Sequence, residues 1–317
     1  MLWFGVRRLA RGLLVVLFVS FLVVALLALA PGSPATVILG ENATPEAVAD
    51  LERQLGLDQP VWVQWWHWIG AAFQGDLGTS LVNGVTVLDA VTTALPVTLE
   101  IAVLALLISL GISIPLALLA APRAGSAADR GVGALTSVLL AIPAFVAAPL
   151  LVYLFAIQLR WFPVTGWVPL SEGIGANLRS AFLPALSVAL IEIAAFQRVL
   201  RADLVTTLRE DYIDAARTKG LSARYVLLRH ALRPSSFSLL TVSGMSLGRL
   251  LGGTIIVEFL FTLPGLGQLV ATSVSSRDVV TVQGVVAFVA MAYVLVNTLV
   301  DIGYGFLDPR VRLADTR

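Results

Sequence analysis

Side chains able to do covalent chemistry are scarce in this 317-residue chain. It has no cysteine, which excludes disulfides, thiolate nucleophiles and cysteine metal ligands. Two histidines, His67 and His230, are too few for a histidine-rich metal site. The only lysine, Lys219, has no glycine loop before it, so the chain lacks a P-loop for nucleotide phosphates. We therefore predict no catalytic residue, no metal site and no bound cofactor, and any ATP must be hydrolysed by another chain.

The composition predicts that the elements positioning its polar groups are membrane helices. Hydrophobic residues make up 58% of the chain and charged residues only 13%, whereas globular proteins average about 25% charged residues. The mean hydropathy is +0.90. These values exclude a disordered chain and a water-soluble enzyme. They indicate an all-α, polytopic membrane protein.

Six apolar segments are long enough to cross a bilayer, which takes roughly 20 residues. They are residues 9–30, 99–121, 131–159, 181–200, 235–263 and 279–300. A secretory signal peptide is the alternative for the first segment. Its uncharged stretch, residues 13–30, exceeds the roughly 7–15 residues of a signal core, which favours a retained helix. We predict six transmembrane helices.

The distribution of basic residues predicts the orientation. Sixteen arginines and lysines fall on one side of the predicted spans and four on the other, with Arg249 inside a span. Basic residues concentrate on the cytoplasmic side of membrane proteins, so both termini are expected in the cytoplasm. The expected parts are residues 1–30, a tail and first helix; 31–95, an external segment with interfacial helices; 96–307, a five-helix core; and 308–317, a cytoplasmic tail.

The external segment contains two expected helices. Thr44 and Pro45 can begin the first, and Gly56 can end it. The second holds four of the seven tryptophans, within residues 60–68. Such a helix is typical of an aromatic anchor at the membrane interface, and a platform for a ligand or partner is the alternative.

The longest predicted cytoplasmic segment is residues 204–234. We expect two short helices that meet at Gly220, the second capped by Ser222 and ended by Pro234. The small side chains of Ala215 and Ala216 would permit close contact with another protein. A basic helix lying on anionic lipid is the alternative, but the acidic residues of this segment would be repelled by that surface.

Several motifs resemble one family of transport proteins. Asp214-Ala215-Ala216, then Gly220, then residues 230–234 (HALRP), resemble the EAA loop of ABC importer permeases. Asp214 stands in place of the usual glutamate, as in the peptide branch. Further matches lie in chain order at residues 31–34, 56–60, 75–80, 96–100, 209–212, 264–267 and 307–312. Together they are similar to the first, B-type permease of dipeptide, oligopeptide and nickel importers.

This resemblance implies a type I ABC importer permease fold in a bacterial cytoplasmic membrane. It implies a second permease subunit, two ATPase subunits that bind ATP and Mg, an extracytoplasmic substrate-binding protein and membrane lipid as partners, and no nucleic acid. Di- or oligopeptides are the implied substrates; a nickel chelate, glutathione or another small solute is the alternative, and an ATPase-independent secondary transporter is a further one. The implied ATPase-coupling residues are Asp211, Asp214, Ala215, Ala216, Gly220, Leu221, Arg229 and His230.

Two charged residues, Glu192 and Arg249, lie deepest within the predicted spans. Charge inside a membrane is costly and therefore marks candidate pathway residues. They could contact the amine and carboxylate of a passing peptide. They could equally form an ion pair between helices or face the partner permease. The sequence leaves these alternatives open.

Overall fold

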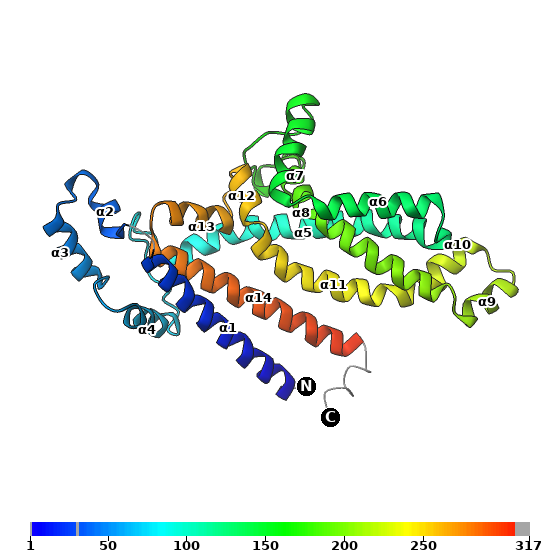
Figure 1. The fold of residues 1–317 in the computed structure, drawn as a ribbon, viewed down its shortest axis with the longest axis horizontal. Coiled ribbons are helices and arrows are strands. Elements are labelled where there is room, and N and C mark those ends of the chain that lie inside the picture. Colours follow the sequence, from blue (N-terminus) through cyan, green and yellow to red (C-terminus); the bar gives the residue numbers. More distant parts are fainter. Residues whose placement is uncertain (1, 30–31, 308–317) are drawn as a thin grey trace. The chain divides into compact units, whose positions relative to one another are not determined.

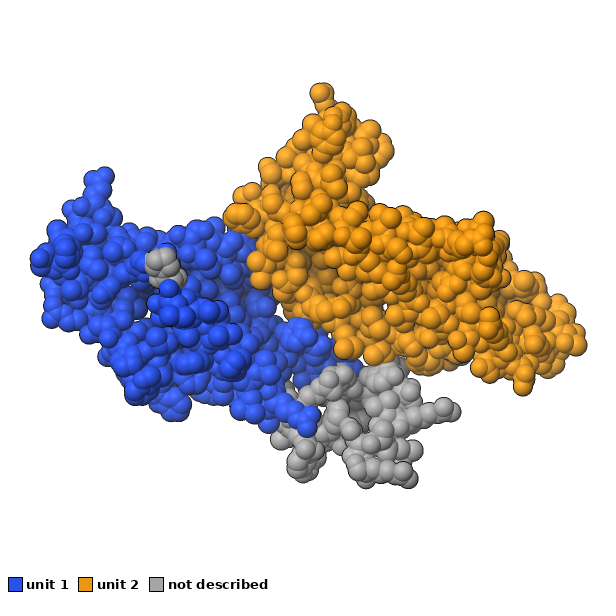
Figure 2. All heavy atoms as spheres, in the orientation of Figure 1, with its two compact units in different colours: residues 1–99, 263–302 blue, residues 100–262, 303–317 orange. Residues whose placement is uncertain are grey.

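The computed structural model describes residues 2–29 and 32–307, which are almost entirely helical. In that part of the chain the only β pairing is an isolated bridge between Thr79 and Thr86. Contacts divide the chain into two compact units (Figure 2). One unit comprises residues 1–99 and 263–302, and the other comprises residues 100–262 and 303–317. The first unit is discontinuous in sequence, because residues 263–302 pack with the N-terminal part of the chain. The predicted parts, which follow the membrane topology, stay a prediction.

The first unit contains eight helical elements among its described residues (Figure 1). They are α1 (Leu2–Leu29), α2 (Pro34–Leu39), the short 3-10 helix η1 (Gly40–Asn42), α3 (Pro45–Leu55), α4 (Val61–Ala72), the start of α5 (Val87–Ala120), α13 (Leu266–Ser275) and most of α14 (Val279–Leu307). Buried Val87, Val91 and Val285 form the centre of its core. The caps predicted for α3 are confirmed: the Thr44 hydroxyl accepts from the Ala47 amide, and Gly56 adopts φ +68°.

The tryptophan-rich helix α4 packs against α1. The Trp65 indole donates to the hydroxyl of Ser20 at 3.0 Å, and its ring meets Phe21 edge-on with centroids 5.6 Å apart. Trp62 and Trp66 remain 65% exposed. The Trp68 indole also donates to the Leu77 carbonyl at 3.1 Å. Two tryptophans therefore hold α4 on this unit, while two others are exposed; the interfacial role of α4 stays a prediction.

Asp278, just before α14, is hydrogen-bonded to the loop that precedes α5. Its buried carboxylate accepts hydrogen bonds from the Ser80 hydroxyl at 2.5 Å, the Leu81 amide at 3.3 Å and the Thr281 hydroxyl at 2.6 Å. In the same loop Gly78 has φ +94°, and a Cβ there would lie 2.5 Å from a methyl of Val280. Glycine is required there by both backbone angle and space.

The second unit holds the remaining helices (Figure 1). They are the end of α5, η2 (Ala121–Arg123), α6 (Ala127–Ala141), α7 (Ala144–Leu151), the π-helix η3 (Val152–Gln158), η4 (Leu170–Glu172), α8 (Ile174–Thr207), α9 (Asp211–Thr218), α10 (Ala223–Tyr225), the π-helix η5 (Val226–Ala231), α11 (Leu232–Gly253) and α12 (Ile255–Phe261). Helix α8 is central and packs against both α6 and α11. Its fully buried Phe196, Leu200 and Leu204 lie in the core of the unit.

Four described helices, α1, α5, α8 and α14, are long and apolar enough to cross a membrane without a break. Two bent helix pairs bring the number to six if each pair makes one crossing. The predicted third span is not one continuous helix, because it bends by 103° between α6 and α7. Pro143 disfavours helical geometry at the residue before it, and Ile142 is extended at φ −98° and ψ 109°.

The predicted fifth span is also bent, by 49° between α11 and α12. The bend follows the pair Gly252-Gly253, and adjacent glycines are a common cause of helix kinks. The second span begins earlier than predicted. Thr86 caps α5 by accepting from the Asp89 amide at 3.2 Å, so α5 starts at Val87, before the predicted apolar segment.

Candidate functional site

The segment joining α8 to α11, residues 208–231, forms the first candidate site. Helix α9 ends in a Schellman motif: the Leu221 amide donates to the carbonyl of Ala216, and the Gly220 amide donates to the carbonyl of Arg217. Gly220 occupies the left-handed position of this motif with φ +81°. The Ser222 hydroxyl then caps α10 by accepting from the Tyr225 amide. As predicted, two helical pieces meet at Gly220.

The inner face of α9 is buried against other parts of the same chain. Ile213 is fully buried and Ala216 is 7% exposed, both within the core that α8 and η5 also enter. Ala216 therefore packs within this chain, and its part in ATPase coupling stays a prediction. Ala216 lies three residues after Ile213, which places both on the buried side of the helix. The position of α9 is therefore set by its packing in the core that it shares with α8 and η5.

The outer face of α9 is exposed and charged. Asp211, Asp214 and Ala215 are all exposed, and Asp214 forms an ion pair with Arg217 at 3.0 Å. Tyr212 lies among them; partial burial and the nearby Glu210 carboxylate raise the pKa of its hydroxyl above the ordinary value. The phenol therefore stays protonated and can donate a hydrogen bond.

A row of apolar side chains continues this outer surface beyond Gly220. Leu221, Tyr225 and Leu228 are between 38% and 50% exposed. Leu221 was among the predicted coupling residues, whereas Tyr225 and Leu228 were not. Leu221 precedes α10, Tyr225 ends it and Leu228 lies in the π-helix η5, so no regular helical spacing marks the three in the sequence. Arg229 is exposed nearby, whereas His230 is half-buried with its ring 5.5 Å from that of Tyr225. Exposed apolar side chains rimmed by charge are typical of a protein interaction surface.

The second helical piece does not end at Pro234, contrary to the prediction. It runs from α10 through the π-helix η5 directly into α11, and Pro234 is the third residue of α11. Proline is tolerated in the first turn of a helix, and the wider π turn changes the hydrogen-bonding register just before it. The segment therefore joins α11 without an intervening loop, so a movement of η5 would pass directly into α11.

Glu192 of α8 and Arg249 of α11 form the second candidate site. The Arg249 guanidinium donates through Nη2 to both oxygens of Glu192, at 3.2 and 3.1 Å. Ser246 completes the cluster, because its hydroxyl lies 2.7 Å from Glu192 Oε2 and 2.7 Å from Arg249 Nη2. Of the alternatives left open by the sequence, the two charges thus form an interhelical ion pair. Ser246 was not predicted, although it lies one turn before Arg249.

Burial within this pair is unequal. The Glu192 side chain is 9% exposed, whereas that of Arg249 is 57% exposed. Only one guanidinium nitrogen of Arg249 bonds within the described part of the chain. The arrangement therefore leaves an arginine held by a buried carboxylate, with further donors available at the surface of α11.

Neither candidate site has the donor set of a metal centre. Among the described residues, no three histidine, aspartate or glutamate side chains converge as a metal ion would require. The groups that these sites do present are exposed charged and apolar side chains on the α9 segment and hydrogen-bond donors at Arg249, which an anionic group could accept.

These features define a helical membrane protein with an exposed, core-anchored segment between two spans. The chain also matches the family described as "Binding-protein-dependent transport system inner membrane component" over residues 113–313, and the N-terminal region of that component over residues 1–102. The chain belongs to this family. Its fold is that of a type I ABC importer permease, as predicted.

Curated relatives cover almost the whole chain. A putative peptide transport system permease protein from Brucella abortus is 40% identical over 96% of this chain and 98% of its own length. A di/tripeptide transport system permease protein from Pseudomonas aeruginosa is 36% identical, covering 98% of this chain and 99% of its own. A glutathione transport system permease protein from Escherichia coli is 34% identical, with the same coverage. The chain is accordingly a multi-pass inner-membrane permease component of an ABC transporter.

Proposed function

We propose that this chain is one permease subunit of an ATP-driven importer of di- or oligopeptides. The observation that carries the proposal is the full-length similarity to relatives named for peptide transport. A second permease would complete the pathway, an extracytoplasmic binding protein would deliver the peptide, and two partner ATPase subunits would bind ATP and Mg. The chain itself would perform no hydrolysis, and no P-loop is present in its sequence.

The α9 surface is the proposed ATPase contact. Its exposed residues Asp211, Asp214, Ala215, Leu221 and Arg229 would dock in a groove of an ATPase subunit. Burial of Ile213 in the core that also holds α8 residues supports this role, because a rigidly held helix can transmit a displacement to the spans. The continuous path from η5 into α11 supports it further. Helices α8 and α11 carry Glu192 and Arg249, so docking and pathway would share the same two spans.

Arg249 is the proposed anion-recognising residue of the pathway. A peptide carries a carboxylate that a half-exposed guanidinium can bind through two parallel hydrogen bonds. The buried Glu192 carboxylate would hold the arginine in place and lower the net charge exposed to the passing substrate. Removal of Arg249 should then weaken transport of peptides more than transport of an amidated analogue that lacks the terminal carboxylate.

The experiment is uptake by the complete transporter reconstituted in liposomes. With binding protein and internal ATP, radiolabelled dialanine or a labelled pentapeptide should accumulate and stimulate hydrolysis. Glutathione is the second candidate, favoured by the Escherichia coli relative, and excess unlabelled glutathione is the competitor that separates the two. Assembly with ATP hydrolysis but without uptake of any peptide would refute the peptide proposal, and uptake without ATP would refute the coupled mechanism.

The proposed orientation has a direct test, because the natural chain has no cysteine to interfere. Single cysteines at exposed Ser222 and exposed Gln74 lie on opposite sides of the predicted topology. A membrane-impermeant maleimide added to intact cells should label Gln74→Cys and leave Ser222→Cys unlabelled until the cells are lysed. The reverse pattern would contradict cytoplasmic placement of the α9 segment.

A further inference from the structure

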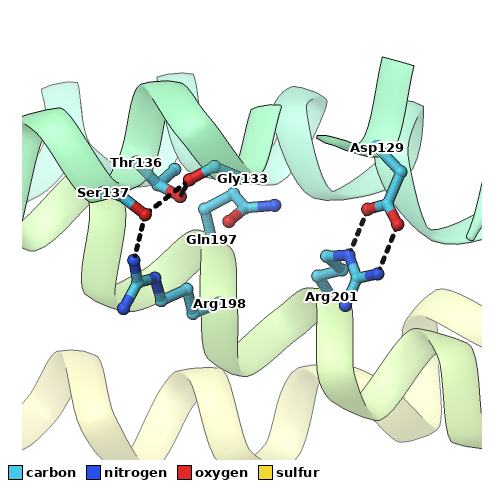
Figure 3. Close-up of a pocket in the computed structure, with 7 residues that line it drawn as sticks. All are labelled: Asp129, Gly133, Thr136, Ser137, Gln197, Arg198 and Arg201. Carbon is cyan, nitrogen blue, oxygen red and sulfur yellow. Dashed lines mark hydrogen bonds and ion pairs between the residues drawn. The ribbon is translucent and has the colours of Figure 1, made fainter. Parts of the chain in front are cut away.

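A polar cavity of about 390 Å³ lies between α6 and α8 (Figure 3). It belongs to neither candidate site described above. Its polar lining comes from residues of the two helices that face one another: Asp129, Thr136 and Ser137 on α6, and Gln197, Arg198 and Arg201 on α8. Four of these six residues lie within predicted spans, so this concentration of hydrogen-bonding groups requires an explanation.

One end of the cavity is a closed ion pair. Arg201 donates to both oxygens of Asp129, at 2.5 and 2.6 Å, in the forked arrangement that arginine forms with carboxylates. Asp129 is 8% exposed and also accepts the Gly125 amide at 2.8 Å. The charge of Arg201 is thus neutralised, and the pair forms a fixed wall that joins α6 to α8.

The opposite end carries an unneutralised positive charge. Arg198 is exposed, and its one hydrogen bond in the described structure goes from Nη2 to the Ser137 hydroxyl at 2.9 Å. No carboxylate of the described residues forms an ion pair with it. The three charged side chains of the cavity therefore sum to one net positive charge. An anion is the complementary ligand.

A buried amide lies between these two ends. Gln197 is 1% exposed, and its Nε2 has no hydrogen-bond partner among the described residues. Figure 3 shows its side chain between the Arg198–Ser137 contact and the Arg201–Asp129 pair. A buried donor without an acceptor costs about 1–3 kcal/mol, so such groups usually serve a bound species. An oxyanion would accept from both Gln197 and Arg198.

The cavity lies where hydrocarbon gives way to the polar membrane surface. Helix α8 has 34 residues and is about 51 Å long, which exceeds the roughly 30 Å hydrocarbon core. Its apolar stretch ends at Leu200, between the two cavity arginines. On α6, Leu135 and Val138 flank Ser137 and are 46% and 55% exposed, as expected of a lipid-facing surface. Within this chain the cavity is therefore open at a surface that exposes apolar side chains rather than enclosed in protein.

We propose that this cavity binds the phosphate group of an anionic membrane lipid. Arg198 and Gln197 would donate to the phosphate oxygens, and the acyl chains would lie along the apolar surface of α6 at Leu135 and Val138. Basic pockets between spans on the cytoplasmic side bind anionic headgroups in this way, and the arginine distribution assigns this end of α8 to the cytoplasm. The lipid would bridge α6 and α8 just before the chain enters the α9 segment.

The test is lipid retention by the purified complex, measured by native mass spectrometry after exchange into equal phosphatidylglycerol and phosphatidylcholine. Wild type should retain phosphatidylglycerol preferentially, and Arg198→Ala should lower that preference about tenfold, as expected for loss of a charge-assisted hydrogen bond. Arg198→Lys keeps the positive charge but cannot donate two parallel hydrogen bonds, so its preference for phosphatidylglycerol should lie between those of wild type and Arg198→Ala. Arg123→Ala is the matched control, because it removes an exposed arginine at the same membrane side outside the cavity.

Several outcomes would overturn the proposal. Equal retention in Arg198→Ala and Arg123→Ala would show that general surface charge attracts the lipid. Displacement of phosphatidylglycerol by millimolar inorganic phosphate would assign the cavity to a free anion. Displacement by substrate peptide would instead make it part of the translocation pathway. If Arg198→Ala fails to assemble, Arg198→Gln decides, because it keeps a hydrogen-bond donor and removes the charge. Wild-type retention of phosphatidylglycerol in that variant would refute recognition of the phosphate by the charge of Arg198.

Discussion

Replacement of the two partners of the Glu192–Arg249 pair should have unequal effects, because their burial is unequal. Glu192→Gln keeps an acceptor for Ser246 and leaves Arg249, 57% exposed, free to reach solvent. Arg249→Met leaves a carboxylate that is 9% exposed with only the Ser246 hydroxyl to compensate it. The second change therefore strands a buried charge, and the first does not.

The expected loss in the free energy of unfolding follows from the same difference in burial. Removing one partner of a fully buried pair costs about 3–5 kcal/mol, whereas exposed pairs contribute about 0–1 kcal/mol. Exposure of the guanidinium screens the attraction, and interhelical hydrogen bonds in membranes average about 0.6 kcal/mol. We expect losses of about 2 kcal/mol for Arg249→Met and about 1 kcal/mol for Glu192→Gln. The double replacement removes both charges and should cost no more than about 1 kcal/mol, a coupling of about 2 kcal/mol.

Melting of the purified complex, followed by size-exclusion chromatography after heating, measures these losses. A loss of 1 kcal/mol lowers the melting temperature by roughly 2–4 °C for domains of this size. Arg249→Met should therefore melt about 4–8 °C below wild type, and the double variant should recover part of that loss. Additive effects of the two single changes would refute the coupling. Unchanged melting with reduced peptide uptake would show that Arg249 serves the substrate without a structural contribution.

Three further changes test other parts of the structure. Gly220→Val should reduce coupled ATP hydrolysis severalfold and leave membrane insertion intact, because a branched side chain at φ +81° costs about 1–2 kcal/mol. Coupled hydrolysis in Gly220→Asn should stay near the wild-type rate, because asparagine tolerates this backbone angle. Asp278→Ala removes the acceptor of the Ser80 and Leu81 hydrogen bonds and should speed hydrogen exchange of amides in the loop before α5 at least tenfold. Unchanged exchange would show that this loop folds without the Asp278 carboxylate. Gly284→Ala would place a Cβ 2.6 Å from a methyl of Val87 and should lower the melting temperature by several degrees, while Gly111→Ala, with open space around it, should not.

Helix ends could be predicted where the signal was local. Thr44 and Gly56 bound α3 as expected, because caps depend on a few neighbouring residues. The 103° bend at Pro143 was not predicted, since the apolar composition continues across it. Hydropathy measures the length of an apolar stretch and carries no information about its direction. The first turns of α5 escaped detection for the related reason that Asp89, Thr92 and Thr93 place them outside the apolar window.

The candidate site was predictable in part. The position of the α9 segment and the turn at Gly220 follow from spacing and backbone chemistry, both readable in sequence. Pairing of Arg201 with Asp129 joins residues 72 positions apart, and only the packing of α6 on α8 brings them together. The same holds for Glu192 and Arg249, which were identified individually because charge is rare within spans. Their mutual contact depends on the rotation of α8 against α11.

Ala215 and Ala216 give the sharpest test of how the α9 segment is built, because adjacent alanines face opposite environments. Ala216 is 7% exposed within the chain's own core, and Ala215 is exposed. Ala216→Leu should overpack this core at a cost of about 1–3 kcal/mol and lower the melting temperature of the permease itself. Ala215→Leu should leave that temperature unchanged and reduce co-purification of the ATPase subunits. Wild-type association and coupled hydrolysis in Ala215→Leu would remove this face from the docking surface, and unaltered melting in Ala216→Leu would contradict the inward packing of α9.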